Sequence, residues 1–389
     1  MTYDFDEIVD RSGTNACKYE DGPSLNPYLT KDAIPLWVAD MDFACAEPIL
    51  AAMRRRLDRR ILGYSTIVEP AYYEAVTGWM DRRFGWKVDP DTISFSSGVV
   101  ASLFAAVQIL TRPEDEVLLM TPAYAPFNRA ANTLGRPLLY SRLIPDKGYY
   151  TVDWEDFAEK AARKSCKLFF LCSPQNPTGR VWTEDELKRI GQICFDNDVF
   201  VVDDEIHADL TRVGVTHTPL AKLFPEEKRI VTCTSPSKTF NIAGNRHSNL
   251  MIPDPTIREQ FAHNAYCGHP GALAIDANIA AYNECEDWLE QLRTYLDGSF
   301  ALVDQMLKAR LPKAVFRIPE GTYLAWVNLS ALGLPEDELN KRVSKGGVFV
   351  QFGKDFVDNG NCCARINLAC PRSVLKEGIK RLCNSLEGL

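Results

Sequence analysis

One lysine stands in a setting where its amine could do chemistry. Lys238 lies in TCTSPSKTFNIAGNRHS, residues 232–248, after an apolar run and beside Ser235 and Ser237. A lysine that is partly desolvated can lose its proton and act as a nucleophile toward an aldehyde. Arg246 follows within the same stretch and could contact a phosphate. The alternative is an ordinary surface lysine, so the surrounding chemistry has to decide between the two.

Three consecutive acids follow another apolar run. Asp203, Asp204 and Glu205 stand in VFVVDDEIHADL, residues 199–210. They cannot all be buried and charged without partners. One carboxylate could meet a cation, such as a metal or a protonated ring nitrogen; alternatively, the acids form a solvated strand end or a helix start. His207 is close in sequence, but no further cluster has the spacing of metal ligands, so we expect no metal site.

Two turns add an amide and a possible anion site. Asn176 lies in SPQNPTGR, residues 173–180, whose prolines and glycine predict a rigid turn. A turn cap and a ligand contact both remain open for this amide. Ser97 and Gly98 precede a helix, and a helix start with small residues suits a phosphate. A nucleophilic lysine, an isolated acid, an amide and a phosphate cradle are together the parts of a pyridoxal phosphate site.

The elements that must position these groups alternate between strands and helices. Buried strands are predicted by short apolar runs at 116–120, 167–172, 199–205 and 229–235. Amphipathic helices are predicted at 98–110 and 183–198, the second with a threonine and a glutamate that form a capping box. This alternation favours an α/β fold with a mainly parallel sheet. Ligands of such sheets bind beyond the carboxyl ends of the strands.

The pattern changes near residue 285. Residues 286–310 predict one long amphipathic helix, and two strands of more mixed character follow at 322–329 and 364–370. We therefore expect two domains. The large domain would span 48–285, and the smaller α+β domain would combine 1–47 with 286–389.

Charge and composition exclude several classes of protein. The chain has 389 residues and a net charge of −8, whereas phosphate-backbone binding needs clustered Lys and Arg. The one basic cluster, RRRLDRR at 54–60, suits an exposed helix face. No apolar run is long enough to span a membrane. Twelve dispersed cysteines without a CxxC pair fit a reducing compartment. We expect a cytoplasmic protein with neither nucleic-acid nor membrane partners.

Nine stretches in order along the chain carry a family resemblance. They are WVADMDF (37–43), GYS (63–65), SSGVV, TPAYAPF (121–127), SPQNPTGRV, DEIHADL, SPSKTFNIAG, EGTYLAWVNL (320–329) and ARINLACPR (364–372). With these, the chain resembles the fold-type-I pyridoxal-phosphate enzymes and, within them, the MalY/PatB group of cystathionine β-lyases and related carbon–sulfur lyases. The resemblance implies pyridoxal 5′-phosphate as cofactor. It also implies a mainly parallel seven-stranded sheet in the large domain and a homodimer with shared active sites.

The resemblance also implies roles around the cofactor ring. Lys238 would be the Schiff-base lysine and the proton shuttle. Asp204 would pair with the pyridine nitrogen, and Asn176 would hydrogen-bond the ring's 3-oxygen. Tyr124 would stack on the ring face, a contact that fits its aromatic geometry, and His207 would lie near the ring.

Further implied roles concern the phosphate and the substrate. The phosphate would be held by Gly98, Val99, Val100, Ser235, Ser237 and Arg246. Tyr64 would reach the phosphate of the neighbouring subunit and contribute to catalysis there. Arg365 would take the α-carboxylate of an amino-acid substrate in a bidentate pair, with Asn176 and Ala39 also contacting the substrate. The alternative for Arg365 is a surface ion pair.

The implied reaction is an elimination. Removal of the α-proton from L-cystathionine, or from a related cysteine S-conjugate, would release a thiol, then pyruvate and ammonia. Three alternatives remain: an aminotransferase, a tailoring lyase acting on an unusual amino acid, and a regulatory protein that binds a transcription activator. Two departures leave the substrate open. Asn245 replaces the family's usual leucine in a polar Asn245–Arg246–His247 segment, and the stretch YCGHPG (266–271) looks individual to this chain.

Overall fold

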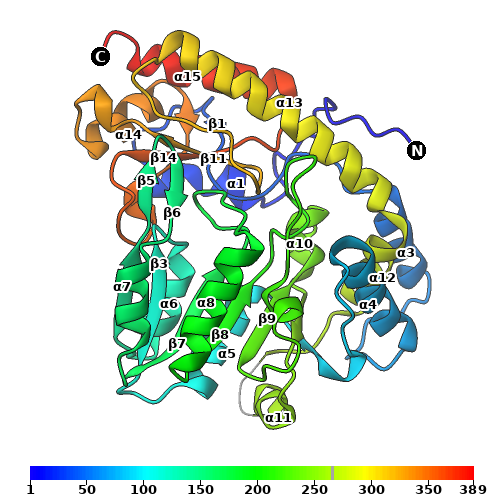
Figure 1. The fold of residues 1–389 in the computed structure, drawn as a ribbon. Coiled ribbons are helices and arrows are strands. Elements are labelled where there is room, and N and C mark those ends of the chain that lie inside the picture. The colour runs from blue at the N-terminus through cyan, green and yellow to red at the C-terminus, as the bar shows by residue number, and fades with distance from the viewer. Residues whose placement is uncertain (264–266) are drawn as a thin grey trace.

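A seven-stranded sheet forms the centre of the protein (Figure 1), which we describe from a computed structural model covering residues 1–263 and 267–389. The strand order is β2-β10-β9-β8-β7-β3-β4. Only β10 runs antiparallel to its neighbours, so the expected mainly parallel sheet is confirmed. The strands are β2 Ile93–Ser96, β3 Glu116–Thr121, β4 Leu138–Arg142, β7 Cys166–Cys172, β8 Phe200–Asp204, β9 Ile230–Thr234 and β10 Ser248–Met251.

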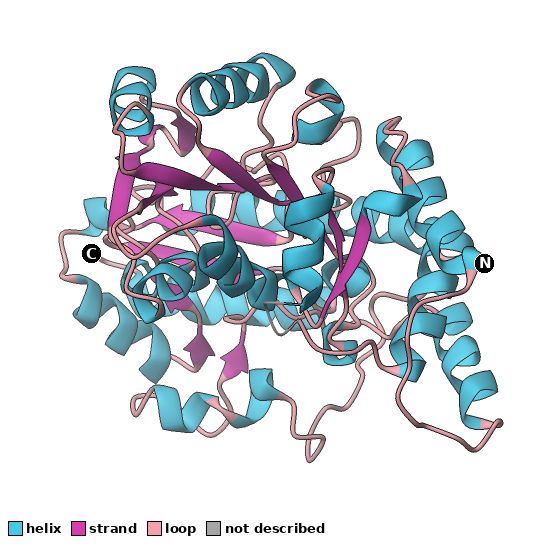
Figure 2. Cartoon of the chain, turned by 90° about the horizontal axis from the view of Figure 1, so that it is seen from below, coloured by secondary structure: helices cyan, strands magenta, loops and turns pink. Residues whose placement is uncertain are grey.

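Helices cover both faces of this sheet (Figure 2). Alternate residues of β7 point to opposite faces: Leu168 and Phe170 join the apolar cluster of α5 and α6, whereas Phe169 and Leu171 join that of α7 and α8. Burial on both faces explains why these strands are continuous apolar runs. The helices before the long α13 are α3 Glu47–Leu57, α4 Pro70–Phe84, α5 Val99–Leu110, α6 Ala125–Thr133, α7 Trp154–Ala161, α8 Glu184–Asp196, α9 Leu220–Leu223, α10 Pro236–Thr239, α11 Pro255–His263 and α12 Ala272–Glu284.

The helices predicted from sequence form where expected. Helix α5 occupies 99–110, and α8 has the predicted capping box between Thr183 and Glu186. The basic cluster after residue 54 ends α3 on an exposed face. Among the described residues, no helix is both long and apolar enough to cross a membrane.

The C-terminal part forms a second layered unit above the central sheet (Figure 1). Its antiparallel sheet has the order β11-β14-β13 and shares a core with the C-terminal half of α13. The N-terminal segment joins this unit, because β1 pairs in parallel with β12 and Leu36 lies in the same core. The boundaries at 47/48 and 285/286 stay a prediction. The elements are β1 Ile34–Pro35, β11 Leu324–Asn328, β12 Val348–Phe349, β13 Gln351–Phe352, β14 Cys363–Asn367, α13 Glu286–Arg310, α14 Glu336–Lys345 and α15 Arg372–Leu386.

Smaller elements complete the described chain. Two short helices lie in the N-terminal segment, and a hairpin follows β4. They are α1 Cys17–Glu20, α2 Gly22–Leu25, β5 Ile144–Asp146, β6 Tyr149–Thr151, η1 Pro90–Thr92, η2 Ala243–Asn245, η3 Ser330–Leu332 and η4 Gly353–Asp355.

Candidate active site

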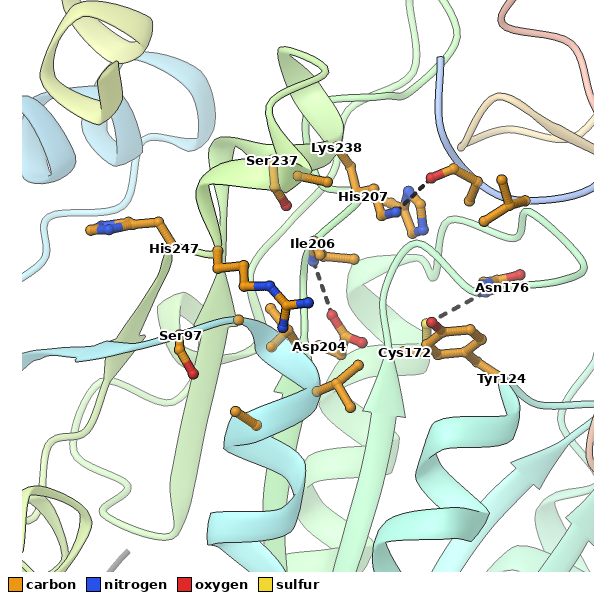
Figure 3. A pocket seen from close by; sticks show the side chains of 18 of the residues that line it. Ser97, Tyr124, Cys172, Asn176, Asp204, Ile206, His207, Ser237, Lys238 and His247 are labelled. Atoms are coloured by element: carbon orange, nitrogen blue, oxygen red, sulfur yellow. Dashed lines mark hydrogen bonds between the residues drawn. The ribbon is translucent and has the colours of Figure 1, made fainter. Parts of the chain in front are cut away.

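A cavity of about 620 Å³ lies beyond the carboxyl ends of the central strands, between the sheet and the C-terminal unit (Figure 3). It brings together all the site residues predicted from sequence except Ser235 and Tyr64. Those that line it are Ala39, Gly98, Val99, Val100, Tyr124, Asn176, Asp204, His207, Ser237, Lys238, Arg246 and Arg365.

Lys238 is half-buried on the short helix α10, which follows β9. Its Nζ donates a hydrogen bond to the carbonyl of Ala39 at 2.5 Å (Figure 3). Burial lowers the pKa of Lys238 to about 8, and Asp40 opposes this shift. The alternative of an ordinary surface lysine is therefore wrong, and a larger fraction of the amine is neutral near pH 7 than for an exposed lysine, although most of it stays protonated.

Asp204 ends β8 and is the one acid of the three-residue run that lines the cavity. Burial raises the pKa of Asp204 to about 7, while the N–H of Ile206, 3.2 Å from Oδ1, lowers it. Strand alternation turns its neighbours Asp203 and Glu205 to the opposite face of the sheet. There Glu205 Oε2 lies 3.4 Å from His217 Nε2.

Arg365 projects from β14 and is buried without a carboxylate partner. Its guanidinium donates to Asn176 Oδ1 at 3.0 Å and to the carbonyl of Trp37 at 3.1 Å, and it also contacts Gln351 Oε1. No ion pair involves Arg365 among the described residues, and its Nε is buried without a hydrogen bond. The alternative of a surface ion pair is therefore wrong. A buried cation without a counter-ion is costly unless a ligand supplies the negative charge.

The opposite end of the cavity is built for an anion. Gly98 has φ of +138°, a conformation that favours glycine, and it is the N-cap of α5 without a side-chain cap. The first N–H groups of α5, at Val99 and Val100, therefore face the cavity without intrahelical partners. Arg246 and Ser237 line the same cavity. A phosphate fits this combination of N–H groups, helix dipole and guanidinium.

Ser235 does not line the cavity, but it contacts Ser237, which does. Its hydroxyl accepts from the N–H of Ser237, donates to the carbonyl of His247 at 2.6 Å, and thereby caps α10. The structure thus assigns it the positioning of the loop that carries Lys238. The predicted contact of Ser235 with phosphate stays a prediction.

Two aromatic rings border the middle of the cavity. Tyr124 is the N-cap of α6, and burial raises the pKa of its hydroxyl. Burial lowers the pKa of His207 to about 3, so this imidazole is neutral, and its Nδ1 has no hydrogen-bond partner among the described residues. The cavity therefore offers two uncharged rings in addition to the cationic Arg365 and the anion site.

Tyr64 is not part of this cavity in the single chain. Its side chain is 100% exposed, in a stretch where Ile61, Leu62 and Val68 are exposed as well. The ring of His269, centred 6.1 Å away, is its aromatic neighbour. Its predicted contact with a neighbouring subunit stays a prediction.

The polar segment at 245–247 divides between two environments. Arg246 and His247 both line the cavity, but the His247 ring points away from its centre (Figure 3) and contacts the Tyr72 hydroxyl at 2.5 Å. The stretch at 266–271 supports the anion site, since the carbonyl of Cys267 accepts from the N–H of Ser97 at 2.8 Å. Its first residue, Tyr266, lies outside the described residues.

Gln351 is a site residue that the sequence analysis missed. It lines the cavity and contacts Arg365, its direct cross-strand partner in the β13–β14 pair. The motif around it matched none of the recognised stretches. The pairing of β13 with β14 would have revealed it, but a two-residue strand leaves no periodic signal.

The fold and this site are those of a fold-type-I pyridoxal-phosphate enzyme. The family model for aminotransferase class I and II matches residues 31–382. Cystathionine β-lyase PatB from Bacillus subtilis is 40% identical over 383 residues, covering 97% of this chain and 98% of PatB. Protein MalY from Escherichia coli is 30% identical, with both chains covered in full. The PLP-bound C–S lyase from Staphylococcus hominis superposes with a TM-score of 0.94 at 38% identity, covering 99% of this chain and 98% of the lyase.

The chain therefore belongs to the class I and II aminotransferase family, in the group of the PatB- and MalY-type proteins.

Proposed function

We propose that this protein is a pyridoxal-phosphate-dependent carbon–sulfur β-lyase. It carries out α,β-elimination on L-cystathionine or a related cysteine S-conjugate, with a thiol, pyruvate and ammonia as products. The observation that carries this proposal is Arg365, a buried guanidinium without a carboxylate partner in the same cavity as the half-buried amine of Lys238. That pair suits an amino-acid substrate, and the PatB and C–S lyase relatives support the choice of reaction.

The cavity fits pyridoxal phosphate at both ends. The phosphate would bind the N–H groups of Val99 and Val100 together with Ser237 and Arg246. The ring nitrogen would meet Asp204, whose buried carboxyl has a single hydrogen bond among the described residues. A protonated ring nitrogen would stabilise the ionised form of this carboxyl. The bound cofactor supplies an electron sink for the charge that develops on the substrate's α-carbon.

The chain's own groups would bind the substrate and move its proton. Arg365 and Asn176 would hold the α-carboxylate in a charge-assisted, planar contact that fixes the orientation of the α-carbon. Lys238 would accept the α-proton, because an amine with a pKa of about 8 is partly neutral at pH 7. The same ammonium would return a proton to the departing sulfur.

Two further proposals concern assembly and location. A homodimer is supported by the exposed apolar side chains around Tyr64, which a second subunit would cover. Tyr64 would then contribute to the neighbouring subunit's site. A cytoplasmic location is supported by the twelve cysteines, all of which are free thiols.

A substrate panel tests the reaction type. The purified holoenzyme is incubated with L-cystathionine and other amino acids, with and without a keto acid, and thiol, pyruvate and ammonia are measured. We expect equal amounts of the three products without any keto acid. Strict dependence on a keto acid would instead establish an aminotransferase. The Lys238→Ala variant is the control, and it should lose both turnover and the visible absorbance of the lysine-bound cofactor.

A further inference from the structure

A second cavity opens from the candidate active site toward the N-terminal segment. Its volume is about 520 Å³. Five residues line both cavities: Val38, Ala39, Lys238, Ala243 and Gly244. Lys238 therefore stands at their junction, whereas Arg365 lines only the first. A substrate with its α-carboxylate on Arg365 and its α-carbon near Lys238 can direct its side chain into the second cavity.

The second cavity carries a charged pair with unused hydrogen-bonding capacity. Arg11 Nη2 lies 2.6 Å from Asp40 Oδ2, and Arg11 Nη1 donates to the carbonyl of Met41 and to Asp42, each at 3.0 Å. A guanidinium has five N–H donors, so the Nε–H and one Nη2–H remain available among the described residues. The Oδ1 atom of Asp40 likewise has no hydrogen bond there. The two side chains are 20% and 27% exposed.

A neighbouring buried ion pair already holds α1 against the loop after Val38. Lys18 and Asp42 are 0% and 6% exposed, and Lys18 Nζ bonds both Asp42 and the Asp40 carbonyl. This buried pair ties α1 to the loop after Val38. Arg11 and Asp40 add to that tie, but they remain open toward the cavity and keep one acceptor and two donors free. Such an arrangement matches a ligand group that carries an ammonium and a carboxylate on one carbon.

We infer that the second cavity binds the leaving half of the substrate, with Asp40 accepting from a distal ammonium and Arg11 donating to a distal carboxylate. The inference rests on the proposed β-lyase function and specifies its substrate class. The preferred substrates are thioethers or disulfides that have an amino-acid group at both ends, such as L-cystathionine. Cysteine conjugates of uncharged thiols fit the first cavity but leave the charged pair of the second one unused.

A matched substrate series tests this on the unmodified holoenzyme. The series is L-cystathionine, S-(2-aminoethyl)-L-cysteine, S-(2-carboxyethyl)-L-cysteine and S-propyl-L-cysteine. Binding is read as a Kd from the absorbance change of the bound cofactor, and turnover is read as kcat/KM from thiol release. We expect cystathionine to have a Kd about tenfold or more below that of the propyl compound and a kcat/KM about tenfold or more above it, with the singly charged compounds between them. Equal Kd and kcat/KM across the series would overturn the inference.

Variants then assign the preference to the charged pair. Asp40→Asn and, separately, Arg11→Gln should lower the ratio of kcat/KM for cystathionine over S-propyl-L-cysteine about tenfold. The ratio cancels any common effect on Lys238, to which Asp40 is electrostatically coupled. The control is Asp297→Asn on α13, which removes the negative charge of an ion pair with Arg212 and should leave the ratio unchanged. A ratio that Asp40→Asn and Arg11→Gln both leave unchanged would overturn the inference.

The two readouts separate the inference from the proposed function. If the Kd values follow the expected order but no compound releases a thiol, the inference stands and the lyase proposal fails. If every compound releases its thiol with similar kcat/KM and similar Kd, the lyase proposal stands and the inference fails.

Discussion

Two charged groups of the candidate active site, Arg365 and Asp204, have no counter-ion in contact among the described residues. Within residues 1–263 and 267–389, Arg365 is buried without a carboxylate in contact, and Asp204 is buried with one backbone hydrogen bond and no cation in contact. A folded chain tolerates such groups only where their cost is met by other interactions or by a ligand. As we propose, pyridoxal phosphate would supply a ring cation for Asp204, and an amino-acid substrate would supply a carboxylate for Arg365. These residues therefore predict the charges of both ligands.

Lys238 leads to a prediction about pH. Burial lowers its pKa to about 8 from the usual 10.5, and a neutral amine is the form that attacks the cofactor's aldehyde. The rate at which the cofactor-free protein captures pyridoxal phosphate should therefore rise with pH and level off above about pH 8. Stopped-flow absorbance measures this rate. Nα-acetyl-lysine, treated identically, corrects for the cofactor's own titration.

A second variant checks the cause of this titration. Asp40 raises the pKa of Lys238 against the effect of burial, so Asp40→Asn should move the midpoint to lower pH. A corrected midpoint near that of Nα-acetyl-lysine would contradict the desolvated state of Lys238.

Residue types with a distinctive chemistry were the ones predictable from sequence. Lys238, Asp204 and Arg365 stand in recognisable motifs, and the cavity contains all three. Gln351 escaped prediction because its role comes from the pairing of β13 with β14, a non-local contact. Ser235 caps α10, since the chain turns its hydroxyl toward Ser237 and His247, and its expected contact with the phosphate stays a prediction.

At the scale of elements, the acidic side chains at the end of strand β8 lie on opposite faces of the sheet. Asp204 lines the cavity, while Asp203 and Glu205 lie under the sheet with His217. The run of three acids could not by itself decide which one meets the ligand, because the register relative to the neighbouring strands fixes the face. The choice of Asp204 came from the family resemblance. Strands β3, β7, β8 and β9 were predicted, since burial on both faces leaves an apolar run. Strands β2, β4, β10 and β13 were not predicted, because their short or mixed sequences leave too little pattern.

The buried Glu205 leads to a prediction about stability. Burial raises its pKa, so the protonated form stabilises the fold. That stabilisation is complete below the carboxyl's ordinary pKa and is lost as pH rises through the raised value. Glu205→Gln keeps the neutral form at every pH. Relative to this variant, the wild type should therefore lose about 1–2 kcal/mol of unfolding free energy as the pH increases through the raised pKa.

Urea unfolding of both proteins at pH 6, 7, 8 and 9 measures the difference. The exposed Glu226→Gln is the matched control, and its difference from wild type should stay constant over the series. A constant difference for Glu205→Gln as well would mean that Glu205 does not change protonation in this range.

At the scale of the whole molecule, the N-terminal segment packs against the C-terminal unit. The N-terminal segment pairs with β12, supplies Ala39 to the active-site cavity and Arg11 to the second one, and lies over the carboxyl end of the central sheet (Figure 1). The candidate site thus brings together residues more than three hundred positions apart in the sequence, such as Trp37 and Arg365. Sequence motifs alone do not reveal that the N-terminal segment contributes to the site. The family resemblance implied such a contribution only for Ala39. Tyr64 is the predicted site residue that this arrangement leaves outside.

Tyr64 leads to a prediction about subunit sharing. If it acts in the partner's site, Tyr64→Ala and Lys238→Ala are defects of different sites in a mixed dimer. One site of that dimer would combine an intact lysine with an intact tyrosine. Random mixing makes half of the dimers mixed, so two poorly active variants co-expressed in equal amounts should recover about a quarter of the wild-type activity. Lys238→Ala with Asp204→Ala is the control: both residues line one chain's own cavity, so neither site becomes whole and no activity should return. Failure of the Tyr64→Ala mixture to exceed this control would place Tyr64 outside the partner's site.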